Sequence, residues 1–244
     1  MKRVYLGNKE LTALATVTNG GGGGGDDTQK WVDFFNRTLT EFTVPEGVTK
    51  IDSNKFKNYD SLISIKLPNS LTYIGDNAFK YCSSLTGITI PNGVTSIGDS
   101  AFSDCSSLSS VTIPDSVTTI KELAFENCSS LTGITIPNGV TSIQYSTFGN
   151  CSSLTSVIFP ANVTYIGYNA FYNCFKLEYV TIQNSTTKLE YNGDAFNGIA
   201  SSAKLYVPSN LLADYQADSN WTSAFKGGIY AIDSSSDGSI HHGS

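Results

Sequence analysis

The stretch that determines the fold reads Cys82-Ser-Ser-Leu85-Thr-Gly-Ile88-Thr-Ile90-Pro91-Asn-Gly-Val94-Thr-Ser-Ile97-Gly-Asp-Ser-Ala101-Phe102. The same arrangement returns every 23 residues along most of the chain. A repeat of this length is typical of a solenoid, in which each unit is one turn and contacts only the turns before and after it. The period holds for six prolines, six phenylalanines and all five cysteines: Pro45, Pro68, Pro91, Pro114, Pro137 and Pro160; Phe56, Phe79, Phe102, Phe125, Phe148 and Phe171; Cys82, Cys105, Cys128, Cys151 and Cys174.

The first half of the repeat predicts a short strand. Ile88 and Ile90 alternate with small or polar residues, which gives the strand one buried face and one free face. Pro91 has no backbone N–H and a fixed φ, so it ends strand pairing and turns the chain. The second half, residues 94–102, predicts a short irregular wall on the opposite side of the turn.

The first 25 residues differ from the repeats. Val4-Tyr5-Leu6 before Gly7-Asn8 indicates a short strand entering a tight turn. We expect no signal peptide, because residues 7–10 interrupt any apolar segment. Residues 20–25 are six consecutive glycines and predict a flexible linker. A phosphate-binding loop is the alternative, but it requires a preceding strand and a Gly-Lys-Ser/Thr sequence or a helix directly after the glycines.

Both ends of a solenoid require caps, since a lone turn cannot bury enough apolar surface to fold. At the N-terminal end we expect a helix within residues 26–42, capped by Thr28 and carrying Trp31 on its apolar side. At the other end, Ser209 is predicted to cap a short helix. The predicted segments are an attachment segment (1–19), a glycine linker (20–25), the solenoid with its helical cap (26–200), a C-terminal cap (201–233) and a disordered tail (234–244).

The repeat resembles the BspA-type leucine-rich repeat family. The shared pattern is Leu-x-x-Ile-x-Ile-Pro-x-x-Val-x-x-Ile-Gly-x-x-Ala-Phe-x-x-Cys. The resemblance implies a leucine-rich-repeat solenoid, an α/β-type repeat architecture that is mostly β, with about seven turns. Its parallel sheet is expected on the concave face and short irregular or 3-10 segments on the convex face. The pattern occurs at Leu62 to Cys82, Leu85 to Cys105, Leu108 to Cys128, Leu131 to Cys151 and Leu154 to Cys174.

Two local departures from the pattern stand out. Lys121-Glu122-Leu123 replaces the glycine in one turn, and Gln144-Tyr145-Ser146-Thr147 replaces Gly-x-x-Ala in another. In contrast, residues 82–97 and 128–143 are identical. Such close copies favour a spacer or a multivalent surface over a single specialised pocket.

The composition excludes several partners. Only 15% of the residues are charged, the net charge is −6, and the chain has no basic cluster. A duplex nucleic acid demands a basic face, so we expect no nucleic-acid partner. The apolar runs are also too short to span a bilayer, and we expect no membrane insertion.

The five cysteines occupy one position of the repeat. Adjacent turns lie about 5 Å apart, which is within the Cα range of a disulfide. However, the Cβ vectors of equivalent residues run parallel, and five cysteines leave one unpaired. A buried thiol ladder is therefore expected, with some disulfide pairing as the alternative. A zinc site needs ligands that converge on one point, whereas this ladder is a line, so no metal site is predicted.

Catalytic residues are scarce. Both histidines, His241 and His242, lie in the predicted tail, which removes the commonest general base from the solenoid. We expect no catalytic residue, no cofactor and no enzymatic activity. The carboxylates on the repeat turns are expected to form a solvated rim: Asp76, Asp99, Asp104, Asp115, Glu122 and Glu126.

The outward positions of the predicted strands form two columns, which we expect to be the ligand-binding surface. Ile158 and Tyr179 are the strongest candidates, because interfaces usually centre on large side chains. Packing of serine and threonine along a plain β-ladder is the alternative reading of these columns. The first column is Glu41, Ser64, Gly87, Ser110, Gly133, Ser156 and Tyr179, and the second is Thr43, Lys66, Thr89, Thr112, Thr135, Ile158 and Thr181. The predicted ligand-binding residues are Lys66, Thr89, Thr112, Thr135, Ile158, Tyr179 and Thr181.

The resemblance implies a function in binding. Proteins similar to this one are mostly surface proteins of bacteria or protists implicated in adhesion, and the same repeats occur in bacteriophage proteins. We therefore expect a non-enzymatic adhesion module, at the cell surface or extracellular, that presents its repeats to a protein or glycan ligand. The alternative is a structural or receptor-binding component of a phage or prophage particle, with a homo-oligomer formed through the N-terminal segment.

Overall fold

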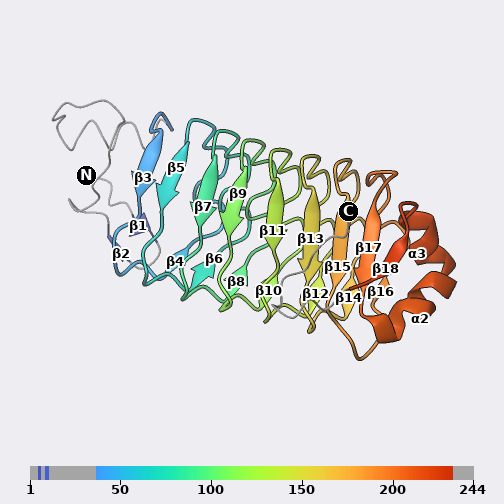
Figure 1. The fold of residues 1–244 in the computed structure, drawn as a ribbon. Coiled ribbons are helices and arrows are strands. Elements are labelled where there is room, and N and C mark those ends of the chain that lie inside the picture. The colour runs from blue at the N-terminus through green and yellow to red at the C-terminus, as the bar shows by residue number, and fades with distance from the viewer. Residues whose placement is uncertain (1–4, 7–8, 11–36, 233–244) are drawn as a thin grey trace.

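The computed structural model describes residues 5–6, 9–10 and 37–232, and residues 37–232 form a solenoid (Figure 1). Strands β1 (Tyr5–Leu6) and β2 (Lys9–Glu10) pair antiparallel, in agreement with the strand and turn expected there. The glycine linker, the tail from residue 234 and most of the helix predicted at residues 26–42 lie outside the described residues.

One strand from each turn lies along one wall of the stack, and we call this wall the main sheet (Figure 1). Its backbone pairing divides into three groups, within residues 41–66, 87–112 and 133–231. Pairing is parallel and in register, with Glu41 opposite Ser64 and Gly87 opposite Ser110. Equivalent residues of successive turns are therefore neighbours. The strands are β3 (Glu41–Thr43), β5 (Ser64–Lys66), β7 (Gly87–Thr89), β9 (Ser110–Thr112), β11 (Gly133–Thr135), β13 (Ser156–Phe159), β15 (Tyr179–Ile182) and β17 (Lys204–Val207).

These strands define about eight turns of a parallel β-solenoid, close to the seven expected. The additional turn carries β17, which lies in the segment predicted to be only a cap. Tyr179 of β15 pairs with Lys204 of β17, 25 residues later, so a search for a period of 23 residues misses this turn. Strand β18 (Ile229–Ala231) then pairs parallel with β17 and ends the sheet.

A second, narrower set of strands replaces part of the irregular wall that the sequence predicted. Each strand has only two residues, of which the second is buried up to β14. Such short strands have no visible alternation, which is why the pattern did not predict them. They are β4 (Lys50–Ile51), β6 (Tyr73–Ile74), β8 (Ser96–Ile97), β10 (Thr119–Ile120), β12 (Ser142–Ile143), β14 (Tyr165–Ile166) and β16 (Glu190–Tyr191).

The corners of the turns use left-handed backbone. Two positions per turn have positive φ, and asparagine, which tolerates this region better than other residues, is the commonest occupant. Backbone bonds join these corners from turn to turn: the N–H of Asn58 donates to the carbonyl of Lys80 at 2.7 Å. The twelve positions are Asn54, Asn58, Asn77, Tyr81, Ser100, Asp104, Leu123, Asn127, Ser146, Asn150, Asn169 and Asn173.

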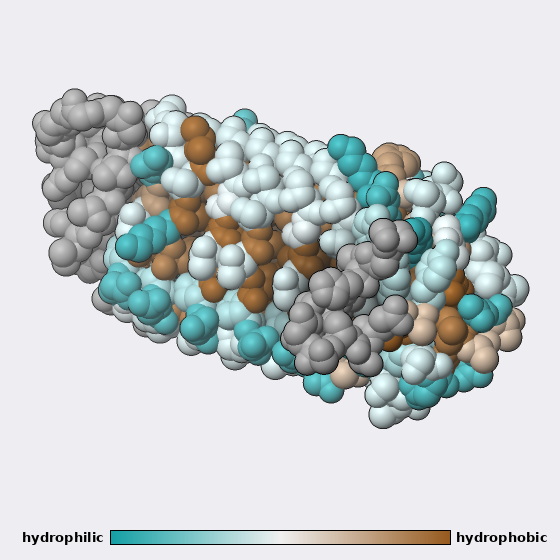
Figure 2. Space-filling view, in the orientation of Figure 1, coloured by the Kyte–Doolittle hydropathy of each residue, from teal (hydrophilic) through white to brown (hydrophobic). Residues whose placement is uncertain are grey.

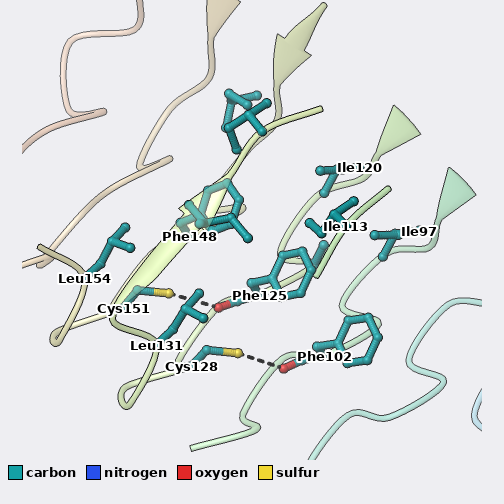
Figure 3. Packing of buried hydrophobic residues seen from close by; sticks show 14 of the residues in the cluster. Ile97, Phe102, Ile113, Ile120, Phe125, Cys128, Leu131, Phe148, Cys151 and Leu154 are labelled. Carbon is teal, nitrogen blue, oxygen red and sulfur yellow. Dashed lines mark hydrogen bonds between the residues drawn. The ribbon is translucent and has the colours of Figure 1, made fainter. Parts of the chain in front are cut away.

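The core is a set of residue ladders along the stack, part of which is drawn in Figure 3. The phenylalanine ladder runs from Phe56 to Phe196, and neighbouring rings are stacked with centroids 5.2–5.6 Å apart. Each ring buries its faces against the rings of adjacent turns. A phenylalanine therefore contributes to two interfaces at once, which couples the turns to one another.

The C-terminal end is closed by a short helical segment. It comprises η1 (Ser209–Leu211), α2 (Leu212–Ala217) and α3 (Ser219–Ala224), which lie at the end of the stack in Figure 1. Trp221 is buried against Phe196, the last ring of the phenylalanine ladder, with centroids 5.8 Å apart. An apolar helix surface thus covers the last turn.

The prediction that Ser209 caps a helix is wrong. Ser209 is the first residue of η1, whose N-cap is Pro208, and the N-cap of α2 is Leu211. The helix cap is Asp218, whose carboxylate accepts a hydrogen bond from the N–H of Asn220 at 2.9 Å. A hydrogen bond and ion pair from Lys188 lower the pKa of Asp218, so this cap stays charged. Lys188 lies 30 residues before Asp218, so the ion pair between them could not be predicted from the local sequence of the helix.

Tyr81 provides a test of the corner geometry. It has φ of 62°, and the equivalent position is asparagine in four other turns (Asn58, Asn127, Asn150 and Asn173) and aspartate in one (Asp104). We expect Tyr81→Asn to raise the free energy of unfolding by about 1 kcal/mol, because it relieves left-handed strain at a ring that is 45% exposed. Urea unfolding followed by circular dichroism measures the difference.

Tyr81→Ala is the matched control, since it removes the same ring but keeps a residue that disfavours left-handed backbone. We expect no stabilisation from it. If alanine stabilised the protein as much as asparagine does, removal of the exposed ring would be the cause and the backbone argument would be wrong.

Candidate ligand-binding surfaces

The main-sheet outer face consists of the two columns defined above. In Figure 2 this face is largely pale and weakly polar, with apolar patches between the rows and strongly hydrophilic residues toward the edges of the view. Strand register places the predicted residues side by side, since Lys66 lies opposite Thr43 and Thr89 lies opposite Thr112 on the neighbouring strand. Strand register therefore aligns the members of the two predicted columns within each group of hydrogen-bonded strands, and their role in binding stays a prediction.

A groove of about 520 Å³ crosses this face over β5, β7 and β9. Three predicted residues line it, Lys66, Thr89 and Thr112, together with Gly87. Gly87 has no backbone need for glycine, since its φ is not in the left-handed region. A Cβ there would lie 3.1 Å from the hydroxyl of Ser110. That contact is tight, so a larger residue at position 87 would have to push the Ser110 side chain aside, and glycine leaves the groove open at this point.

The other predicted residues lie beyond this groove. Thr135 is exposed on β11, next to Gly133, whose Cβ direction meets no atom within 4 Å. Ile158 is 38% exposed, whereas Tyr179 is half-buried. The structure thus brings Thr135 and Ile158 onto one continuous open surface.

Thr181 differs from the expectation of an exposed residue. Its side chain is buried, and its hydroxyl has no hydrogen-bond partner among the residues that the structure describes. Strand β17 extends the sheet past Thr181 and places the larger Tyr206 directly opposite it. Because the sequence assigned this segment to a cap, it could not show that Thr181 has a bulky neighbour.

The carboxylates form structural contacts at the rim. The Nζ atom of Lys121 bonds to Asp99 at 3.2 Å and to Asp76 at 3.4 Å, so one lysine ties together three turns. Asp104 accepts a hydrogen bond from Asn127 at 2.9 Å. Within residues 37–232, no cluster of three potential metal ligands occurs. The described part of the chain also contains no helix that is long and apolar enough to cross a membrane.

The cysteines form the buried thiol ladder that the sequence predicted. All five are free and buried. Each thiol donates to the carbonyl of a phenylalanine in the preceding turn; the Sγ of Cys128 lies 3.2 Å from the oxygen of Phe102 (Figure 3). Burial raises the pKa of Cys82 and Cys174 to about 12. These thiols are therefore neutral at physiological pH and serve packing.

Two surfaces escaped the sequence prediction. A corner groove of about 550 Å³ is lined by Asn127, Asn150, Asn173 and Phe175, and Phe175, at 60% exposed, replaces the serine of earlier turns. On the wall of the two-residue strands, Tyr145, Tyr165 and Tyr168 are exposed. Both surfaces contain residues that depart from the repeat pattern, and these departures could have revealed them in the sequence. The prediction of the ligand-binding residues considered only the outward positions of the main strands.

The geometry defines the class of protein: a parallel β-solenoid built from leucine-rich repeats. The family described as BspA type leucine rich repeat region matches residues 32–151 and 122–216, in six copies. The chain belongs to this family, as its repeat suggested. A sequence search of curated proteins finds no match.

Solved structures agree with this assignment. The T. pallidum leucine-rich repeat protein TpLRR is 30% identical with a TM-score of 0.62, over 65% of this chain and 76% of that one. A leucine-rich repeat protein from Eubacterium ventriosum is 29% identical with a TM-score of 0.59, over 66% of this chain and 43% of that one. The pneumococcal vaccine antigen PcpA, at 16% identity and a TM-score of 0.51, shares the fold.

The thiol ladder predicts a loss of stability in alkali. In the unfolded chain the cysteines titrate near pH 8.5, whereas burial keeps them protonated in the folded state, to about pH 12 for Cys82 and Cys174. Above about pH 8.5 the unfolded state therefore binds fewer protons, and each thiol lowers the free energy of unfolding by up to about 1.4 kcal/mol per pH unit. Urea unfolding between pH 7 and pH 10 measures this decline.

The matched comparison is Cys128→Ala. Whatever its effect on stability at pH 7, this variant has one buried thiol fewer, so its stability should fall less steeply with pH than that of the parent. Equal slopes for the two proteins above pH 8.5 would contradict the assignment of the decline to buried thiols.

Proposed function

We propose that this protein is a non-enzymatic adhesion module displayed at a cell surface, and that its main-sheet outer face binds a protein or glycan ligand. The observation that carries the proposal is the groove over β5, β7 and β9, which three of the predicted residues line. Membership of the BspA-type family supports a role in binding rather than catalysis.

The chemistry of the groove suits a weakly charged ligand. Thr89, Thr112 and Ser110 offer hydroxyls that donate and accept hydrogen bonds, and Lys66 adds the positive charge at one end. A regular sheet holds these groups in fixed positions, which lowers the entropy lost on binding. Few large side chains are present, so we expect a weak individual contact.

Repetition compensates for weak contacts. The Gly87-Ile88-Thr89 segment recurs as Gly133-Ile134-Thr135 two turns later on the same face. A ligand with repeated groups can engage both segments at once, and the second contact is then intramolecular. We therefore expect the preferred ligand to be extended and repetitive, such as a glycan chain or a repetitive surface protein.

Gly133→Tyr tests the proposed surface. Its Cβ meets no atom within 4 Å, so the ring should project over the sheet without disturbing the fold. The full chain is screened against a glycan array and immobilised matrix glycoproteins, and bound partners are titrated with each variant. We expect the ring to weaken binding at least about tenfold, as for a blocked interface centre.

The control is Thr119→Tyr, which adds the same ring to an exposed position on the two-residue strands. It should leave binding within a factor of about two. The proposal fails if Gly133→Tyr binds as tightly as the parent, or if both variants lose binding equally.

A component of a phage particle remains the alternative, and it depends on residues 1–36, most of which lie outside the described residues. Fibre proteins of particles are commonly trimeric, so this alternative predicts a trimer of the full chain. Light scattering gives the mass directly. A monomer of the 26.1 kDa chain supports the surface module, and a trimer supports the particle component.

A further inference from the structure

A column of side chains changes chemistry along the wall of the two-residue strands. The position in question lies two residues after the end of each two-residue strand. In three successive turns it is acidic (Asp76, Asp99 and Glu122), and in the next two it is tyrosine (Tyr145 and Tyr168). Each tyrosine is 41% exposed. The earlier turns show that the fold accepts an acidic residue here, so packing does not demand an aromatic ring.

The two tyrosine rings form an ordered platform. Their centroids are 6.1 Å apart and their planes differ by only 4°. Interaction of the Tyr168 hydroxyl with the carboxylate of Asp194 raises the pKa of Tyr168. Tyr165, on β14, exposes a third ring on the same wall.

The column ends in an open position. Tyr165 pairs with Glu190, so the residue that follows Tyr168 in the next turn is Gly193. A Cβ at Gly193 would meet no atom within 4 Å, and φ at Gly193 is not in the left-handed region. Neither the backbone conformation nor the packing therefore requires glycine at position 193. Because Gly193 has no side chain, it leaves space beside Tyr168.

A groove of about 410 Å³ begins at this open position. It is lined by Gly193 and Asp194 and by the polar side chains of Asn197, Asn220 and Lys226. Tyr191 forms its inner wall, and the Tyr191 hydroxyl donates to the backbone carbonyl of Asn220 at 2.7 Å, which ties α3 to the last two-residue strand. The volume is within the range of about 300–1,000 Å³ typical of small-ligand sites.

This combination matches the chemistry of a sugar. A pyranose ring has an apolar face of C–H groups, which packs on the electron-rich face of an aromatic ring, and an edge of hydroxyls that both donate and accept. The carboxylate of Asp194 accepts from such hydroxyls, and the amides of Asn197 and Asn220 do both. We propose that Tyr145, Tyr168 and the groove beside Gly193 form a binding site for an uncharged oligosaccharide.

Charge argues against an acidic glycan. Asp194 lines the groove together with the cation Lys226, and Glu122 is the member of the column that comes before Tyr145. Glu190, opposite Tyr165, is paired with Lys188 at 4.0 Å. The chain as a whole has a net charge of −6. Sialylated or sulfated sugars are therefore repelled, while uncharged sugars are not.

The proposed sugar site is separate from the main-sheet outer face, and it does not depend on the function proposed above. The test uses the full chain on an array of uncharged, sialylated and sulfated oligosaccharides, followed by calorimetric titration with the tightest uncharged one. We expect Tyr168→Ser to weaken binding of the uncharged sugar at least about tenfold, and the double variant Tyr145→Ser/Tyr168→Ser to abolish it. Thermal unfolding checks that both variants fold.

Two further variants separate the causes. Tyr168→Phe keeps the ring but loses the interaction with Asp194, and it should retain more affinity than Tyr168→Ser. Gly133→Tyr blocks only the main-sheet outer face and should leave this affinity unchanged. The proposal is overturned if no uncharged sugar binds, if the double variant still binds, if only acidic sugars bind, or if Gly133→Tyr alone removes binding.

Discussion

Every part of this structure depends on the hydrogen bonds that join one turn to the next in register. The N–H of Val44 donates to the carbonyl of Lys66, and that of Phe56 donates to the carbonyl of Ala78, so both walls are bonded along the stack. A single turn has no such hydrogen-bond partners. The free-energy cost of ordering its residues is larger than the free energy that it gains by burying its own apolar side chains. Register is thus the condition for folding, and the constant repeat length is how the sequence maintains it.

Register has a consequence for the interior. A residue type that fits one turn meets its own copy in the next, which favours side chains that pack well against themselves. Phenylalanine stacks on phenylalanine, and each cysteine thiol donates to a carbonyl one turn away. The interior is therefore under tight and uniform constraint. The outer positions are free of this constraint, so their residues can differ from turn to turn without disturbing the core.

The positions of the main strands, the buried thiol ladder and the two outer columns could all be predicted, because each follows from a strict period and local alternation. The burial of Thr181 could not, since its neighbour Tyr206 lies in a turn that breaks the period. Ser209 was assigned as a cap from its local sequence, whereas Lys188 and Asp218 meet through the stacking of distant segments. The platform of Tyr145 and Tyr168 was visible only as a departure from the pattern.

The amino-acid sequence alone determined the solenoid, its repeat length and which residues face the core, because a period of 23 residues admits one register and each residue's side of the strand follows from alternation. Only the tertiary structure decided which outer residues line a common groove. Grooves arise where a missing side chain, as at Gly87 and Gly193, lies beside larger residues of other turns. The depth of a groove depends on the side chains that surround it in space, and these come together only when the turns stack.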